Sequence, residues 1–249
     1  MKGSSARILE FSTSTATIAM KKTLIAYASV FFALLLSGCA TPTPMAFKND
    51  ADRLTETSKP VFLMTATLKN TYKTSWQPRV LVVHVEKPGA KEAADRINFT
   101  MDDKARASET DSATEGNSYL LRLELPAGSY EIRGLTSLAR SFPVNGFFFT
   151  PLHSSLEVKE PGVYYLGHVR ATVRERQGNE FRAGPPIPLI DQAVAGASGG
   201  SFDIEITDEF AVDEAKFRAK FPALAGVPIK KAVLPAFDRA KAQAWWDKN

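Results

Sequence analysis

The chain of 249 residues contains one cysteine, Cys39, and only three histidines. A single cysteine can form neither an intrachain disulfide nor a metal site built from several thiolates. The fold must therefore rest on its apolar core, and the 44% of hydrophobic residues suffice for one. The apolar run Thr23–Leu36 is shorter than the roughly 20 residues that a membrane-spanning helix needs.

Motifs of the common enzyme classes are also missing. The sequence has no Gly-x-Ser-x-Gly elbow, no His-Glu-x-x-His pair and no phosphate-binding glycine loop. No serine and histidine form a recognisable nucleophile pattern, and no ligand residues have metal-site spacing. We therefore expect a protein that is not an enzyme, with no catalytic residues, no cofactor and no metal site.

The net charge of +4 gives no indication of a nucleic-acid partner. Lys2, Arg7, Lys21 and Lys22 against Glu10 contribute +3 of it, which leaves about +1 after residue 38. Basic and acidic residues alternate along that remainder, whereas a nucleic-acid binder needs a clustered basic footprint. We expect no nucleic acid among the partners.

Isolated polar residues leave two alternatives open. His84 and His168 fall on predicted strands in an outward register, so they either share a metal between neighbouring strands or face solvent singly. His153 follows Pro151 in a predicted loop. Asp102-Asp103 either binds a cation or forms a solvated turn. Solvent-facing histidines and a solvated turn are the more common outcomes, and we favour both.

The segment before Cys39 has the three parts of a secretory signal. Met20-Lys21-Lys22 is basic, the run to Leu36 is apolar, and Ser37-Gly38 supplies small residues at a cleavage site. The signal would end at residue 38. Residues 1–19 are rich in serine and threonine without a core pattern, which favours Met20 as the true start.

The order Leu36-Ser37-Gly38-Cys39 resembles the lipobox of bacterial lipoproteins. The resemblance implies a diacylglyceryl group on the Cys39 sulfur, cleavage before Cys39, and acylation of the new amino group, with palmitate as a typical acyl chain. Two or three acyl chains anchor a protein stably in the lipid bilayer, whereas one does so only marginally. Ala40 in place of the aspartate that retains lipoproteins at the inner membrane favours the outer membrane, facing the periplasm.

Beyond Cys39 the chain changes from a polar to an alternating pattern. Residues 39–60 carry Pro42, Pro44 and Pro60, and we expect a lipidated N-terminus followed by a flexible tether. From Val61 apolar and polar residues alternate as in half-buried strands. The expected strands cover residues 61–69, 79–86, 96–101, 119–125, 130–132, 156–158, 163–173 and 202–206, with loops over 102–118 and 177–201.

Two turns suggest hairpins. Pro126-Ala127-Gly128-Ser129 separates one pair of alternating segments, and Glu160-Pro161-Gly162 separates another. The stretches Leu125–Ile132 and Gly162–Gly167 resemble hairpins of transthyretin-like, or carboxypeptidase-regulatory-like, domains. The resemblance implies a mainly β fold, an antiparallel β-sandwich over residues 61–207, and says nothing about activity.

Residues 208–249 return to a helical period and form a predicted C-terminal extension. Asp213 is expected to cap a helix that ends near Phe221, before a proline. A last helix over 236–246 should present one stripe, consisting of Phe237, Ala240, Ala244 and Trp245, to the sandwich. Its receiving surface should be Phe147–Phe149, because three consecutive strand residues leave at least one ring facing outward.

These observations indicate an extracytoplasmic lipoprotein of the cell envelope, anchored by Cys39. Its expected role is structural or protein-binding, with an envelope protein as a candidate partner. The alternative is a ligand-binding module that holds a glycan or an apolar small molecule near Phe147.

Overall fold

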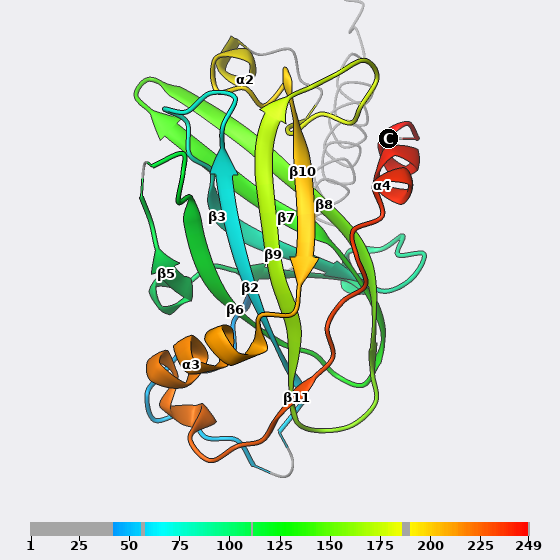
Figure 1. Ribbon diagram of the computed structural model, residues 1–249. Helices are drawn as coiled ribbons and strands as arrows, with labels where there is room; N and C mark the ends of the chain where they lie inside the picture. The colour runs from blue at the N-terminus through cyan, green and yellow to red at the C-terminus, as the bar shows by residue number, and fades with distance from the viewer. Residues whose placement is uncertain (1–41, 56–57, 111, 186–189, 249) are drawn as a thin grey trace, which may run out of the picture. The chain divides into compact units, whose positions relative to one another are not determined.

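The computed structural model describes residues 42–55, 58–110, 112–185 and 190–248. Cys39 and the predicted signal, residues 1–38, lie outside these ranges. Within them the chain forms two β-sheets and a few short helices (Figure 1). The first sheet has the strand order β1 (Pro42–Pro44), β4 (Arg96–Thr100), β3 (Arg79–Glu86), β7 (Gly128–Ser141) and β8 (Val144–Val158).

The second sheet carries the candidate site. Its strand order is β10 (Gly200–Thr207), β9 (Val163–Glu175), β2 (Val61–Asn70), β6 (Asn117–Glu124) and β5 (Arg106–Ser108), and β11 (Ile229–Lys231) also pairs with β9. The helices are η1 (Ala93–Asp95), η2 (Asp103–Ala105), α2 (Ile190–Val194), α3 (Phe210–Lys220), η3 (Pro222–Leu224) and α4 (Arg239–Trp246). No helix in the described ranges is long and apolar enough to cross a membrane.

The prediction of a mainly β fold is confirmed, but the sheets are mixed rather than antiparallel. Strands β2 and β9 run parallel, as do β1 with β4 and β11 with β9. The inner faces of the two sheets supply one core. Leu121, Val83, Ile132 and Val169 come from four strands of the two sheets, and each is 0% exposed. The alternation seen in the sequence therefore marks core-facing residues correctly in β2 and β6.

Both predicted hairpins are wrong. The turn after Leu125 leads from β6 in the second sheet to β7 in the first, and the turn at Pro161 leads from β8 in the first sheet to β9 in the second. The long hairpin is instead β7–β8, which closes at Ser141 paired with Val144. Alternation identifies a strand and its buried face, but it does not say which of two sheets the strand joins.

Strand β9 contains a bulge that decides the geometry of the candidate site. Tyr165 pairs with Leu63 and His168 with Thr65, so β9 has one residue more than β2 between these pairs. Gly167 has a φ of 107°, a value that side chains rarely allow. The bulge puts Tyr165 and His168 on the same outer face, whereas strict alternation predicted Tyr165 and Val169 on one face.

The outer face of the second sheet is partly covered by α3 and by the N-terminal segment. Phe217 and Phe221 pack there in a second, smaller core with Leu63 and Leu120. Asp213 lies one turn before Phe217 and is 0% exposed, so the prediction that Asp213 caps the helix is wrong. It lies inside α3, on the face turned toward the sheet.

Residues 42–47 lie within the predicted flexible tether but are docked on the domain. Strand β1 pairs with β4, and Phe47 is 7% exposed. The Ala46 N–H donates to the carbonyl of Arg122 at 3.1 Å, and the Arg122 Nε donates to the carbonyl of Ala46 at 2.7 Å. Prolines occur in edge strands as well as in flexible tethers, so the proline content of this segment did not distinguish the two.

The C-terminal helix docks on the predicted surface, although with a different face. Trp245 packs against Phe149, with tilted rings whose centroids are 5.6 Å apart. The buried residue of α4 is Ala242, while Ala240 and Ala244 are exposed, so the predicted stripe is wrong in those two positions. Of the phenylalanine run, Phe148 is buried and Phe147 remains 45% exposed.

The segment 177–201, predicted to be a long exposed loop, is largely packed. Phe181 and Ala183 belong to the main core, and the Phe181 N–H donates to Gln243 Oε1 of α4 at 2.7 Å. Helix α2 follows, while residues 186–189 lie outside the described ranges. The described part of this segment therefore covers the core and is not a free loop.

Candidate functional site

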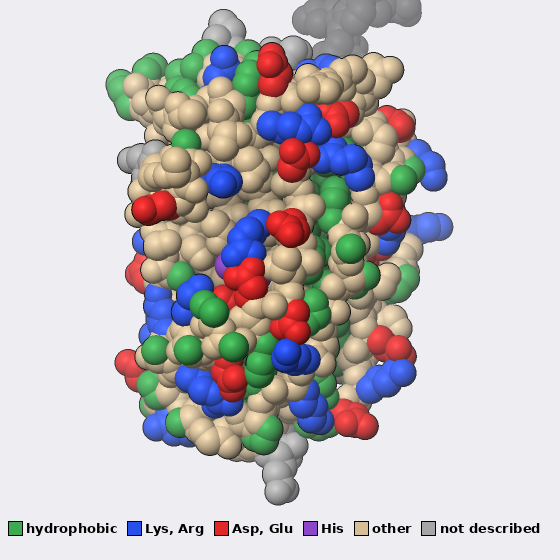
Figure 2. Space-filling model, in the orientation of Figure 1, with side chains coloured by type: hydrophobic (Ala, Val, Ile, Leu, Met, Phe, Trp, Pro, Cys, Tyr) green, Lys and Arg blue, Asp and Glu red, His purple; other side chains and the backbone are tan. Residues whose placement is uncertain are grey.

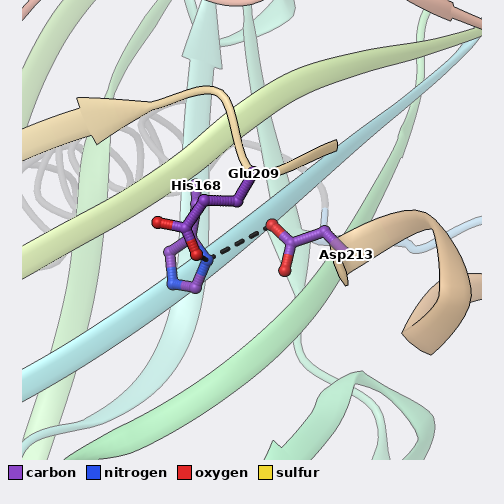
Figure 3. A group of neighbouring side chains, drawn as sticks. All are labelled: His168, Glu209 and Asp213. Atoms are coloured by element: carbon purple, nitrogen blue, oxygen red, sulfur yellow. Dashed lines mark ion pairs between the residues drawn. The ribbon is translucent and has the colours of Figure 1, made fainter. Parts of the chain in front are cut away.

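Polar and charged side chains converge where β10 leaves the second sheet and the chain enters α3. Strand β10 pairs with β9 until Thr207 opposite His168, and β11 takes over the same edge at Tyr165. The departure of the chain brings Glu209 and Asp213 over the outer face of β9. Figure 2 shows charges of both signs on this face, and Figure 3 shows both carboxylates directed at one nitrogen of His168.

The His168 ring lies in a buried position with different partners on its two nitrogens. The residue is 3% exposed. Nε2 lies 2.9 Å from the hydroxyl oxygen of Thr67 on β2. Nδ1 lies 3.3 Å from Glu209 Oε2 and 3.2 Å from Asp213 Oδ2, but neither contact has the geometry of a hydrogen bond.

The Asp213 carboxylate is buried but well supplied with donors. The Tyr165 hydroxyl donates to Oδ2 at 2.7 Å, and Lys216 Nζ lies 3.3 Å from Oδ1. Burial raises the pKa of Asp213, but the contacts with His168 and Tyr165 outweigh burial and bring this pKa to about 2. Asp213 is therefore ionised at neutral pH.

Glu209 is held from the solvent side. Arg170 contacts both of its carboxylate oxygens, with Arg170 Nη2 to Oε2 at 2.6 Å, and the Thr207 hydroxyl donates to Oε1 at 2.8 Å. The hydrogen bonds from Arg170 lower the pKa of Glu209 to about 2, against the opposing effect of its partial burial. The Glu209 N–H donates to the Tyr165 hydroxyl at 3.3 Å, which ties the two carboxylate-bearing residues to the same tyrosine.

Thr67, His168 and Asp213 form a row of hydroxyl, imidazole and carboxylate, the order that nucleophilic catalysis uses. In a catalytic triad the carboxylate hydrogen-bonds the imidazole, whereas here neither Asp213 nor Glu209 makes a hydrogen bond to Nδ1. The Thr67 hydroxyl can donate to Ser118 Oγ at 3.2 Å, and it accepts from His168 when the ring carries its hydrogen on Nε2. Two carboxylates facing Nδ1 are suited to holding a cation near this atom.

The other polar residues singled out from the sequence lie elsewhere. His84 is on β3 in the first sheet, where it contacts Asn98 and Thr136, so it cannot share a metal with His168 in the second sheet. His168 is buried beneath the residues from α3, and the expectation that it faces solvent is wrong. His153 lies in β8 rather than in a loop, with Nδ1 2.8 Å from Glu131.

Asp102 and Asp103 do not combine into one site. Asp102 accepts a hydrogen bond from the Ala105 N–H at the start of η2 and pairs with Arg122 at 2.5 Å. The Asp103 side chain is 95% exposed and pairs with Arg106. The Asp102 carboxylate thus balances a buried arginine rather than a bound cation.

The sequence analysis did not identify Tyr165, Glu209 and Asp213 as site residues. Two features of the sequence could have indicated the site. Asp213 shares a helical stripe with Phe217 and Phe221, and an acidic residue on an apolar stripe indicates a buried carboxylate with partners. Gly167 in the middle of a strand indicates a bulge, which changes the face of every residue after it.

Cys39, the predicted lipidation site, lies outside the described ranges, and its lipidation stays a prediction. Comparison of the whole chain with known proteins gives no match to a family model, to a curated protein or to a solved structure.

Proposed function

We propose that the chain is a lipid-anchored protein of the bacterial cell envelope that acts by binding or by structural support rather than by catalysis. The support for the anchor is the order Leu36-Ser37-Gly38-Cys39 behind a basic and an apolar segment. Two or three acyl chains on Cys39 would hold the protein without a spanning helix. Ala40 favours the outer membrane, with the domain in the periplasm.

The docked segment directly after Cys39 gives this proposal its geometry. Pro42 is already part of β1, and Arg122 fixes the segment at Ala46. Only three residue steps separate Cys39 from Pro42, and an extended chain covers at most about 3.6 Å per step, so an anchor on Cys39 would lie within about 11 Å of Pro42. The domain would therefore sit close to the bilayer surface, as suits a module whose partners are in or on the membrane.

The candidate site favours binding over catalysis, because Asp213 does not make the hydrogen bond to Nδ1 of His168 that a catalytic triad uses. A transthyretin-like arrangement of the two sheets stays a proposal, supported by their common core. The alternative is a ligand-binding module near Phe147. One exposed ring favours it, but the two neighbouring rings of the run are packed within the fold.

Fatty-acid labelling of wild type and the Cys39→Ala variant tests the anchor. Wild type should incorporate an alkynyl palmitate probe, fractionate with membranes and lose residues 1–38. The variant should stay unlabelled and uncleaved. Ala40→Ser is the matched control, because it changes the next residue without removing the sulfur. Equal labelling of all three proteins would contradict the proposal.

The short distance to the membrane can be tested separately. Because acylation would block the sulfur of Cys39, a thiol-reactive dye would label only a second cysteine, introduced at the exposed Leu81. Energy transfer from this dye to acceptors on lipid head groups should be efficient, and a flexible Gly-Ser insertion between Thr41 and Pro42 should reduce it. Unchanged transfer after the insertion would show that the segment does not hold the domain near the bilayer.

A further inference from the structure

The Nδ1 atom of His168 is a buried polar atom that faces two carboxylates without a hydrogen bond. His168 is 3% exposed, and the Glu209 and Asp213 oxygens lie 3.3 and 3.2 Å away. Buried polar atoms nearly always have a partner, since leaving one unpaired costs the free energy of removing it from water. The position of Nδ1 therefore needs an explanation beyond packing.

The direction of the neighbouring hydrogen bonds narrows that explanation. In the tautomer with its hydrogen on Nε2, the His168 ring donates to Thr67, which donates in turn to Ser118. Nδ1 of that neutral ring points a lone pair at two carboxylates, a repulsive arrangement that a cation between the three ligand atoms relieves. The cation is either a second proton on the ring or a metal ion.

The distances match a metal ion. Zinc binds histidine nitrogen and carboxylate oxygen at about 2.0–2.2 Å, so neighbouring ligands in a tetrahedral site are about 3.4 Å apart. The separations of 3.2 and 3.3 Å from Nδ1 fit this value, and the three ligand atoms all lie within 4.8 Å of one another. We propose that His168, Glu209 and Asp213 bind a divalent transition-metal ion, with zinc as the best match to one nitrogen and two oxygens.

The surrounding contacts are those that orient metal ligands. Thr67 fixes the ring through Nε2, Tyr165 holds Asp213, and Thr207 holds Glu209. Outer partners of this kind select the tautomer of a ligating histidine and the direction of its carboxylates. Since the site lies wholly within the folded domain, it does not depend on lipidation of Cys39.

Arg170 would compete with a metal ion for Glu209. It contacts both oxygens of Glu209, so a metal ion must share Oε2 with it or displace it. Its side chain is 41% exposed, and it lines, together with Thr67, a surface pocket of about 370 Å³. Removal of Arg170 should therefore free Glu209 and strengthen metal binding.

The test is a titration of the purified full chain, after chelator treatment and dialysis, with Zn²⁺ by calorimetry and with Co²⁺ by visible absorption. Wild type should bind one ion per chain and show the absorption bands of low-coordinate Co²⁺. Glu209→Gln should weaken binding by about tenfold or more, and Arg170→Met should tighten it. Glu175→Gln, which changes an exposed acid at the far end of the strand that carries His168, should leave binding unchanged.

Circular dichroism confirms that each variant is folded before titration. His168→Gln and Asp213→Asn should abolish binding, but both substitutions change buried groups. If either variant fails to fold, the variants at the two more exposed residues, Glu209→Gln and Arg170→Met, test the proposal instead. Absence of saturable binding in wild type would mean that Nδ1 holds only a proton and would overturn the proposal. Equal affinity in wild type and Glu209→Gln would overturn it too, by placing the ion elsewhere.

Discussion

Replacement of Arg122 by methionine should destabilise the folded chain by about 3–5 kcal/mol, the usual cost of breaking a buried ion pair from one side. The Arg122 side chain is 0% exposed, pairs with Asp102 at 2.5 Å, and donates to the carbonyls of Ala46 and Leu120. Its guanidinium also lies 4.3 Å from the ring centroid of Phe221. The variant loses all of these contacts at once.

Removal of the partner instead should also be costly. Asp102→Asn leaves the arginine charge buried without a counter-charge, and burial already lowers the pKa of Arg122 against the effect of Asp102. The double variant should lose less stability than the sum of the two single variants, because neither residue is then left unpaired. Urea unfolding of the four proteins measures this difference, and Arg122→Met should lower the Tm by about 6–20 °C.

The same variant has a local consequence that proteolysis can detect. Loss of the Arg122 contact to Ala46 should release the segment that follows Cys39, so that cleavage near Lys48 becomes faster under native conditions. Arg106→Met, which removes an exposed arginine nearby, is the control and should change neither stability nor cleavage. An Arg122→Met protein within 0.5 kcal/mol of wild type would refute the reasoning about this buried arginine, with about 0.5 kcal/mol being the ordinary effect of a surface substitution.

Three further outcomes follow from the packing. Gly167→Ala should cost about 1–3 kcal/mol in urea unfolding, since its φ of 107° disfavours a side chain and the new Cβ would lie 3.1 Å from a carbonyl of β10. Arg174 lowers the pKa of Glu180 from 4.5 to about 2, so the stability that Glu180 contributes is present above about pH 4.5 and is lost as the pH falls toward 2. Glu180 also pairs with Arg239 of α4, the helix that carries Trp245, so acidification should change the tryptophan fluorescence of wild type. Glu180→Gln should remove that change. Trp245→Ala should lower the Tm and increase binding of a hydrophobic dye, because its ring covers Phe149, and unchanged values for both would show that α4 is not needed as a cover.

The sequence was a good guide where a residue's own neighbours decide its position. The alternation in Val61–Lys69 and Tyr119–Leu125 identifies strands and their buried faces, and both segments form strands that pack in the core. The docking of Trp245 near Phe149 could also be expected, because three consecutive rings cannot all face the core. In each case period and hydrophobicity carry the information.

The sequence was a poor guide where distant segments decide. Nothing local distinguishes a turn within a sheet from one that crosses between sheets, so the turns at Pro126 and Pro161 were both misread. The candidate site requires that β9 bulge at Gly167 and that α3 begin where β10 ends, which brings Asp213 over His168. Such a site depends on strand register, which alternation within a single strand does not specify.

The central claim, a lipid anchor on Cys39, is tested most directly by the intact mass of the protein purified from its own membranes, with fragmentation of its N-terminus. The account predicts a chain that begins at Cys39 and carries a diacylglyceryl group, with or without a third acyl chain. A chain that retains the sequence before Cys39, or that begins at Cys39 with an unmodified thiol, would contradict it.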